Sequence, residues 1–235
     1  MNDAIVAAID ERGITRLCHF TPSRNLQHIA AGRIGVLSTA SLQAAERAAF
    51  NQTDVERLDG RTTHICCSIE FPNAWYFDKA RSNEKLFPDW VVLLISPRYL
   101  AEDETLFCPR NAAAQYGRYI VQGTEGFNSL FSPSVTGAGN FVRSREALHR
   151  LNCPTDEQAE ILIHDRILLS DLVGVAVASA EQARTERARL RVNGVDPDQF
   201  RFVIAPQMFN KYALSKVIRR GDGAVEDVYH PSVAK

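Results

Sequence analysis

The stretch of sequence that decides the fold is Cys153–Ile163, which reads CPTDEQAEILI. It opens with a turn-forming Pro-Thr-Asp and runs into an apolar Ile-Leu-Ile segment. Side chains alternate between the two faces of a strand, so burial of the aliphatic face would place the Glu160 carboxylate at the mouth of a sheet. On this interpretation one face carries Gln158, Glu160 and Leu162, and the other carries Ala159, Ile161 and Ile163.

Two simpler interpretations of the same stretch stay open. Thr155 and Gln158 have the spacing of a helix capping box, which would begin a helix here instead of a strand. Alternatively, Glu160 is an ordinary exposed residue at a strand end. A carboxylate at a buried strand end, by contrast, suits contact with a sugar hydroxyl or stabilisation of a developing cation.

The composition indicates an ordinary globular protein. The chain has 235 residues, 45% of them hydrophobic, which predicts a full core and, most simply, one α/β or α+β domain over residues 1–235. A net charge of −1 argues against a general polyanion binder. The five cysteines include the adjacent Cys66-Cys67 but no CxxC, so we expect no disulfide framework, no metal site and a reduced, cytoplasmic compartment. We also expect no signal peptide and no membrane span.

The first part of the chain alternates helix and strand signals. Asp3–Glu11 is an expected amphipathic helix, and Thr15–Phe20 is an expected strand that leads into a helix over Arg24–Ala31. His19 therefore lies at the end of a strand and Asn25 in the first turn of a helix, which is a favourable place for a ligand contact. Taken singly, both residues are more often plain structural residues.

The middle of the chain carries the strongest strand signals. Thr63–Ile69 reads as a buried strand, and the unbroken apolar run of Asp89–Ser96 predicts a central one. Between them, Asn73 and Trp75 stand in an aromatic cluster near basic residues; such clusters are more often core, but the strand-to-helix junction makes a pocket a second interpretation. We expect an Ala-rich helix at Ser41–Phe50.

The segment before the organising stretch is expected to be irregular. Gly117–Asn140 is rich in Gly, Ser, Asn and Pro, and long irregular segments are usually functional or mobile. Arg143 and Arg145 follow it. Beyond Ile163 we expect strands at Leu172–Ala178 and Phe200–Ala205, a helix at Glu181–Val192, and a basic tail. That helix aligns three arginines on a face that is either solvated or phosphate-binding: Arg184, Arg187 and Arg191.

Several of these segments together resemble the DarT family, which comprises NAD-dependent DNA ADP-ribosyltransferase toxins of bacterial toxin–antitoxin systems. His19-Phe20-Thr21 with Asn25-Leu26 resembles the N-terminal element of that family. Asp54-Val55-Glu56-Arg57 resembles the segment with its catalytic arginine, and Pro154–Leu162 resembles the segment with its catalytic glutamate. The order agrees, and the resemblance covers roughly residues 16–204.

The resemblance implies a set of roles. The fold would be a single α+β domain with a split, strongly curved central sheet and an NAD cleft between its halves. Glu160 and Arg57 would be catalytic, and His19, Thr21 and Asn25 would hold NAD, which is a substrate here; no metal is needed. Loss of nicotinamide develops oxocarbenium charge on the ribose, as in glycoside hydrolysis, and a carboxylate stabilises that charge.

The resemblance also implies an acceptor and a partner. The acceptor would be a base in single-stranded DNA, contacted by aromatic and basic residues of the loop before the glutamate. Thymidine-modifying members carry a Tyr-Phe-x-x-Arg-x-Pro-Met-like run where this chain has Ser68–Trp75, so we expect guanine over thymine. An antitoxin protein, of the ADP-ribosyl hydrolase type, would oppose the toxin. The expected DNA-contacting residues are Glu70, Asn73, Trp75, Arg143 and Arg145.

Two other classes of function are kept as alternatives. One is an ADP-ribosyltransferase of the same fold that acts on RNA or protein, which only the labelled acceptor would distinguish. The other is a non-catalytic nucleotide- or nucleic-acid-binding module, which would have no chemical use for Glu160, Arg57 and His19 together.

Overall fold

The structure is a computed structural model that describes residues 1–31, 35–42, 59–137, 139 and 141–231. Most of the helix expected at Ser41–Phe50 lies outside these residues. Arg57 also lies outside them. The α-helices are α1 (Asp3–Arg12), α2 (Asn25–Ala31), α4 (Ala74–Asn83), α5 (Gly123–Ser129), α6 (Ala180–Val192) and α7 (Lys211–Arg220). The strands are β1 (Leu17–Pro22), β2 (Val36–Leu37), β3 (His64–Ile69), β4 (Trp90–Ile95), β5 (Leu106–Cys108), β6 (Val121–Gln122), β7 (Ser134–Thr136), β8 (Val142–Ser144), β9 (Glu160–His164), β10 (Arg166–Ile167), β11 (Leu172–Val177), β12 (Phe202–Ile204) and β13 (Asp227–Val228).

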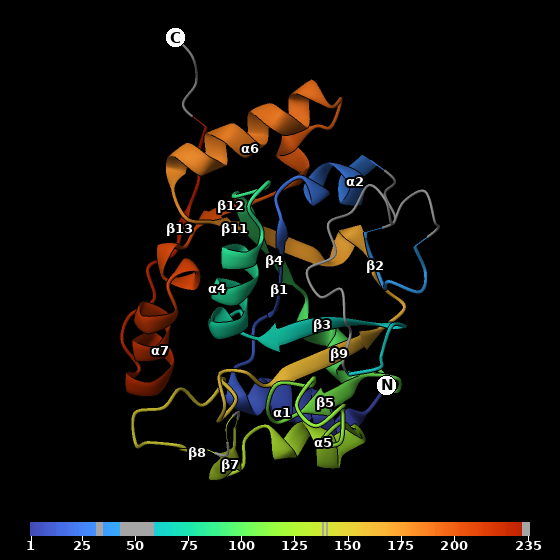
Figure 1. The fold of residues 1–235 in the computed structure, drawn as a ribbon, viewed down its shortest axis with the longest axis vertical. Helices are drawn as coiled ribbons and strands as arrows, with labels where there is room; N and C mark the ends of the chain where they lie inside the picture. Colours follow the sequence, from blue (N-terminus) through green and yellow to red (C-terminus); the bar gives the residue numbers. More distant parts are fainter. Residues whose placement is uncertain (32–34, 43–58, 138, 140, 232–235) are drawn as a thin grey trace.

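The described residues form a nine-stranded mixed sheet in the order β13-β12-β11-β4-β1-β3-β9-β5-β6 (Figure 1). Neighbouring strands of this sheet are antiparallel except β11 and β12, which are parallel. β4 is buried along its whole length because it lies between β1 and β11, as its unbroken apolar run predicted. The α+β class is thereby confirmed.

The sheet is split between β1 and β3. β1 pairs with β4 over six residues, from Leu17↔Ile95 to Pro22↔Trp90. It pairs with β3 over only two, Leu17↔Ile69 and Cys18↔Ser68. Beyond Cys18 the two strands separate, and β3 continues instead with β9. The split central sheet expected from the sequence is therefore present.

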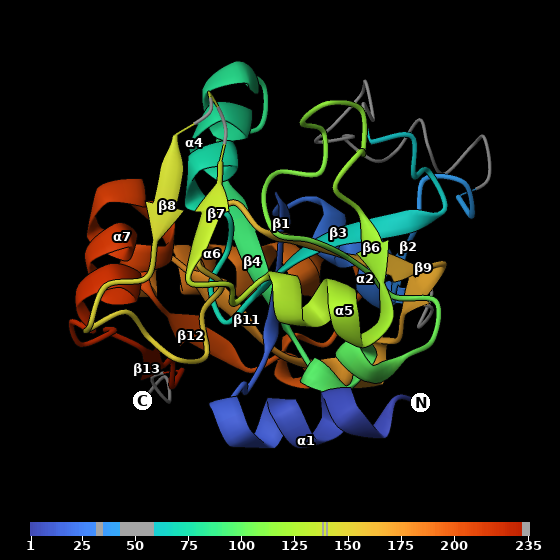
Figure 2. The ribbon, with the colours of Figure 1, turned by 90° about the horizontal axis from the view of Figure 1, so that it is seen from below.

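The two faces of the sheet are covered by different helices. One face packs on α1, α2, α5 and α6, whose buried side chains join those of Leu93 and Ile161 in one cluster. The other face packs on α4 and α7, which contribute Phe77 and Val217 to a second cluster with Val92. Figure 2 shows α1 and α4 on opposite sides of the molecule. Burial of both faces explains why the central strands are apolar throughout.

Two segments differ from expectation. Gly117–Asn140 contains β6, α5 and β7 and is not irregular throughout, because Phe127 and Leu130 are fully buried and fix the short helix against the sheet. The basic tail contains the helix α7, which the sequence analysis did not predict. Its apolar residues Leu214, Val217 and Ile218 occupy one face and pack against α4 and the sheet.

The arginine face expected on α6 is only partly solvated. Arg184 and Arg191 are exposed, but Arg187 is buried and pairs with the Asp198 carboxylate at 2.5 Å. The three arginines therefore do not form one phosphate-binding row. Among the residues that the structure describes, no helix is long and apolar enough to cross a membrane.

Gly35 lies against the backbone of the small β2–β10 ladder, so a substitution there tests how tightly this ladder is packed. Its φ is +89°, and a Cβ there would overlap the carbonyl oxygen of Ile167, which pairs with Val36. We expect Gly35→Ala to lower the free energy of unfolding by about 2–5 kcal/mol, through backbone strain and overpacking together. Urea denaturation measures this change.

Gly13→Ala is the matched control, because Gly13 also has a positive φ, +64°, but a Cβ there meets nothing within 4 Å. It isolates the conformational cost, about 1–2 kcal/mol. Equal losses in the two variants would contradict the packing that is described here for Gly35.

Candidate active site around Glu160

Glu160 is the first residue of β9 and lies beside β5, where it pairs with Cys108. Glu160 is only 9% exposed, so the interpretation as an exposed strand-end glutamate is wrong. Its Oε1 accepts a hydrogen bond from Asn111 Nδ2 at 2.9 Å. The register of β3 and β9 gives Glu160 the same face of the sheet as Leu162 and Cys66. A preorganised carboxylate thus sits in a largely dry position.

Asn111 was not identified from the sequence as a site residue. It follows β5, and its Oδ1 accepts a hydrogen bond from the Ala113 amide at 3.1 Å. This contact fixes the side-chain amide so that Nδ2 points at Glu160. A single Asn beside an alanine run has no spacing signal, which explains why sequence reasoning passed over it.

His19 lies across the split from β9. Its Nδ1 is 2.8 Å from the carbonyl oxygen of Cys66 in β3. A carbonyl oxygen only accepts, so Nδ1 donates, and a neutral His19 carries its lone pair on Nε2. His19 and Glu160 therefore flank β3 on its two sides, close to the point where β1 leaves it.

Thr21 and Asn25 lie at the far end of β1. Asn25 Nδ2 donates to Thr21 Oγ1 at 2.8 Å, and both residues are buried. The Asn25 Oδ1 is also buried and has no hydrogen-bond partner among the described residues. A buried acceptor without a partner is costly, which marks this carbonyl as a position that a ligand donor would satisfy.

The segment before β9 forms a turn and not a helix. Asp156 Oδ1 accepts from the Gln158 amide at 3.0 Å, and the Thr155 hydroxyl donates to the Ser132 carbonyl at 2.6 Å. The capping-box interpretation of Thr155 and Gln158 is therefore wrong. The strand begins only at Glu160, which is later than the alternation suggested.

Glu157 connects this turn to two helices. Its carboxylate accepts from Trp75 Nε1 at 3.1 Å, from the Ser215 hydroxyl, and from Arg219 Nε. The Glu157 side chain is 6% exposed, so these three contacts replace water. Glu157 thereby fixes the turn that precedes Glu160 to α4 and α7.

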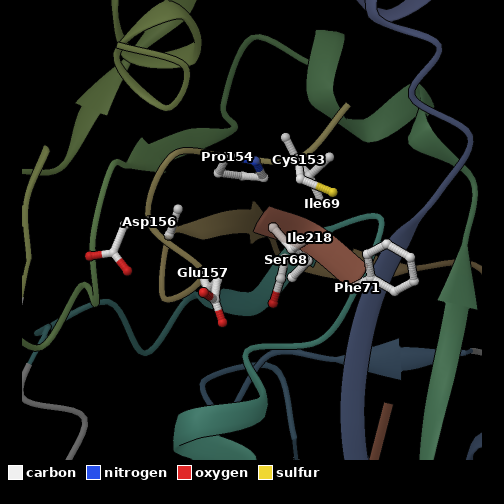
Figure 3. Close-up of a pocket in the computed structure, with 9 residues that line it drawn as sticks. Ser68, Ile69, Phe71, Cys153, Pro154, Asp156, Glu157 and Ile218 are labelled. Atoms are coloured by element: carbon white, nitrogen blue, oxygen red, sulfur yellow. The ribbon is translucent and has the colours of Figure 1, made fainter. Parts of the chain in front are cut away.

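The same turn borders a narrow cavity between the end of β3 and α7 (Figure 3). Figure 3 shows the carboxylates of Asp156 and Glu157 pointing in different directions. Glu160 and His19 are not among the lining residues of this cavity. The lining residues are Ser68, Ile69, Phe71, Cys153, Pro154, Asp156, Glu157, Ala159 and Ile218.

Two of the expected DNA-contacting residues are engaged within the chain. Glu70 is 4% exposed, and its carboxylate accepts from the backbone amides of Thr15 and Arg16 and from the Thr15 hydroxyl. It neither faces solvent nor presents its carboxylate to a base. Arg145 donates to the carbonyls of Cys153 at 2.8 Å and Arg150 at 2.7 Å, so it holds the chain before the turn.

The other three are differently placed. Asn73 caps α4, where its Oδ1 accepts from the Tyr76 amide at 3.0 Å, and its buried Nδ2 has no partner among the described residues. Trp75 is half-buried and is held through Nε1 by Glu157. Arg143 is half-buried in β8, on the β7–β8 hairpin.

The described residues contain no group of three or more His, Cys, Asp or Glu side chains placed to hold a metal ion. Burial raises the pKa of the Cys67 thiol well above its ordinary value, and it raises the pKa of Cys108 to about 12. Both cysteines lie on strands that flank β9 and remain neutral thiols. They therefore act as small apolar side chains of the sheet, Cys108 beside Glu160 and Cys67 beside Ile161 on the opposite face.

Asp156 provides a test of this electrostatic environment. Burial is the main cause that raises the pKa of its carboxyl above the ordinary 3.8, and its Oδ2 is buried without a described partner. The folded state then holds a proton that the unfolded state has lost, so this group destabilises the fold as the pH rises from about 4. We expect Asp156→Asn to gain stability relative to wild type between pH 4 and pH 7, measured by urea denaturation at both values.

Asp222→Asn is the control, because Asp222 is exposed and the same change of charge there meets water. A difference between wild type and Asp156→Asn that stays constant over this pH range would contradict the assignment.

Comparison with known proteins gives this geometry a context. The sequence model of the family described as "ssDNA thymidine ADP-ribosyltransferase, DarT" matches residues 18–210. The comparison with curated proteins gave no match. Among solved structures, the fold is similar to DarT of Thermus sp. 2.9 in complex with NAD+, with a TM-score of 0.51, 15% identity, and coverage of 79% of this chain and 97% of that chain.

Two further structures have a similar fold. One is the same Thermus sp. 2.9 protein in complex with ADP-ribosylated ssDNA, with a TM-score of 0.52 and 12% identity over 80% of this chain and 97% of that one. The other is Thermosipho africanus DarTG in complex with ADP-ribose, with a TM-score of 0.53 and 14% identity over 83% of this chain and 51% of that one. The family match extends over most of the chain and includes His19, Glu160 and the split sheet between them. The chain therefore belongs to the DarT family of ADP-ribosyltransferases.

Proposed function

We propose that this chain transfers ADP-ribose from NAD to a base of single-stranded DNA, with Glu160 as the catalytic carboxylate. The observation that carries the proposal is the buried carboxylate of Glu160, held by Asn111 at 2.9 Å at the start of β9. We further propose that residues 1–235 act as one ADP-ribosyltransferase domain.

The chemistry needs a negative charge beside the ribose. As the bond from ribose C1′ to nicotinamide breaks, the bonding pair passes to the pyridinium ring, which leaves neutral, and positive charge develops on the ribose. Glu160 stabilises this charge and accepts a hydrogen bond from a ribose hydroxyl. The attacking base nitrogen then forms the new bond to C1′ and releases a proton, for which Glu160 is the acceptor. Arg57 would orient the base.

The NAD site would lie along β1. His19 and Thr21 lie on that strand beyond the point where it separates from β3, and Asn25 opens the helix α2 that follows it. The unpartnered Oδ1 of Asn25 supports this assignment, because NAD offers hydroxyl and amino donors. The Thermus sp. 2.9 protein of similar fold was solved with NAD+, which supports NAD as the donor.

The acceptor DNA would approach from the side of α4 and the β7–β8 hairpin. A paired, stacked base cannot reach C1′ in line, so an already unpaired strand avoids an unpairing cost of a few kcal/mol. Trp75 and Arg143 are the remaining candidates for stacking and for a phosphate contact. The similar Thermus sp. 2.9 structure with ADP-ribosylated ssDNA supports the choice of a single strand.

We propose guanine as the acceptor base, with thymine as the competing choice. Ser68–Trp75 lacks the Tyr-Phe-x-x-Arg-x-Pro-Met-like run of thymidine-modifying members. Asn73 Nδ2 is an unused buried donor suited to the guanine carbonyl, whereas Glu70 no longer supports the choice. The matching family model names thymidine, which makes the base the sharpest point to test.

The cellular role follows from the adduct. A bulky, charged group on a template base would block replication, so we propose a cytoplasmic toxin that is opposed by an antitoxin protein of the ADP-ribosyl hydrolase type. Expression of wild type in bacteria would then be toxic, and expression of Glu160→Gln would be harmless.

Glu160→Gln tests the catalytic assignment. The amide keeps the size of the side chain and removes the charge, so we expect a loss of roughly a thousandfold in the rate of transfer, the scale of a lost electrostatic stabiliser. Incorporation of label from NAD into an oligonucleotide measures the rate, and thermal unfolding checks that the variant is folded. Near-normal transfer by the variant would contradict the role of Glu160.

The acceptor is tested with labelled NAD and four separate substrates: single-stranded DNA, duplex DNA, RNA and protein. We expect label in single-stranded DNA, on guanine, as identified by mass spectrometry of oligonucleotides that each lack one base. An adduct on thymidine alone would refute the proposed base and keep the enzyme class. Label confined to RNA or protein would refute the DNA acceptor.

A further inference from the structure

The helix α7, Lys211–Arg220, lies beyond the stretch that the family model matches, which ends at residue 210. It nevertheless packs beside the candidate site. Its Ser215 and Arg219 contact Glu157, in the turn that leads to Glu160. The backbone carbonyl of Ile218 accepts from the Arg150 amide at 2.9 Å. The helix is therefore fixed to the segment between the β7–β8 hairpin and β9.

The outer face of α7 is basic. The helix carries four basic residues and no acidic one. Lys211 and Arg219 are paired, with Asp78 and Glu157 respectively. Lys216 and Arg220 are exposed, and neither makes an ion pair or a hydrogen bond with any residue that the structure describes. These two cations leave an unneutralised positive charge on a protein whose net charge is −1.

Tyr212 continues the same face. Tyr212, Lys216 and Arg220 follow at intervals of four residues and therefore line one stripe of the helix. Tyr212 is 66% exposed, so its ring is accessible to a stacking base. We call Tyr212, Lys216 and Arg220 the α7 stripe.

The aromatic end of the stripe is held in a fixed orientation. The Tyr212 ring meets the Trp75 ring edge-on, with centroids 5.8 Å apart at 82°. The Lys211 ammonium lies 5.3 Å from the centre of the Trp75 ring and 5.4 Å from that of Tyr212. Trp75 is in turn fixed by its hydrogen bond to Glu157. An exposed tyrosine that is held in a fixed orientation by a half-buried tryptophan, beside two cations unpaired among the described residues, has the composition of a single-strand binding surface.

We propose that the α7 stripe binds the single-stranded DNA that flanks the acceptor base, with a neighbouring base stacked on Tyr212 and phosphates on Lys216 and Arg220. This inference rests on the proposed function and extends it to a surface outside the matched family region. The contacts are independent of sequence, because every base has a face to stack and every nucleotide a phosphate. These contacts would increase the number of nucleotides that the protein binds, without altering the chemistry at Glu160.

The test measures binding apart from catalysis. Protein that carries Glu160→Gln is titrated, without NAD, into fluorescein-labelled DNA oligonucleotides of about 20 and of about 4 nucleotides. The longer strand exceeds the binding site of one small domain, whereas the shorter one does not. We expect added Tyr212→Ala to weaken binding of the long strand about five- to tenfold, the low end for one stacked base. Binding of the short strand should stay unchanged.

The charges are tested by salt. The double variant Lys216→Ala/Arg220→Ala should reduce the slope of log Kd against log salt by about 0.7 for each charge removed, for the long strand only. Arg184→Ala/Arg191→Ala is the matched control, because these α6 arginines are exposed and the change of charge is the same. Equal effects of the two double variants would show a general charge effect and overturn the surface.

The outcomes separate this inference from the proposed function. If wild type modifies single-stranded DNA while the stripe variants bind both strands as the parent does, the surface is refuted and the function stands. If the long strand binds through the stripe but no base is modified by wild type, the surface stands and the proposed function fails. If the stripe variants weakened the binding of RNA more than that of DNA of the same length, the surface would be assigned to RNA and the proposal would be overturned.

Discussion

The early separation of β1 from β3 is the constraint on which the rest of the structure depends. The two strands share only two residue pairs, yet each continues in a full ladder on its other side. Backbone groups at the split have no strand partner, and one of them, the Cys66 carbonyl, accepts from His19 Nδ1. A side chain from β1 thus replaces the missing ladder contact, and the residues that flank the split become the candidate site.

A buried carboxylate beside such a split must be held without being neutralised. Asn111 donates a hydrogen bond to Glu160, and the neighbouring Cys108 stays an uncharged thiol. The turn that precedes Glu160 is fixed by two contacts: Arg145 donates to the Cys153 carbonyl, and Arg219 donates to the Glu157 carboxylate. Arg145 and Arg219 are thus already engaged by groups of the chain itself. The polar residues around Glu160 are therefore mainly positioning groups, which explains why Glu70 and Arg145 do not face a substrate.

The sequence predicted the central sheet and missed its additions for identifiable reasons. β4 and β9 carry long or alternating apolar runs, which locate strands directly. α7 was missed although its buried Leu214, Val217 and Ile218 have the spacing of an amphipathic helix, because its basic residues were interpreted as a solvated tail. His19 and Glu160 were assigned to the site by the resemblance to the DarT family, whereas Asn111 and Glu157 depend on contacts between distant segments. Such contacts leave no local signal in one sequence.

Net charge was a weak guide to the partners of this protein, because it does not show which charges are paired within the chain. Arg16 pairs with Glu226, Arg187 with Asp198 and Lys211 with Asp78, each within 2.7 Å, and such pairs have little field left for a distant ligand. What acts on a polyanion is the remainder, and on α7 that remainder is positive. A chain of net charge −1 can therefore hold a single strand locally while lacking the general basic surface of a duplex binder. Under the proposed function, this distribution of charge would confine the affinity for a single strand to the surface beside the turn that precedes Glu160.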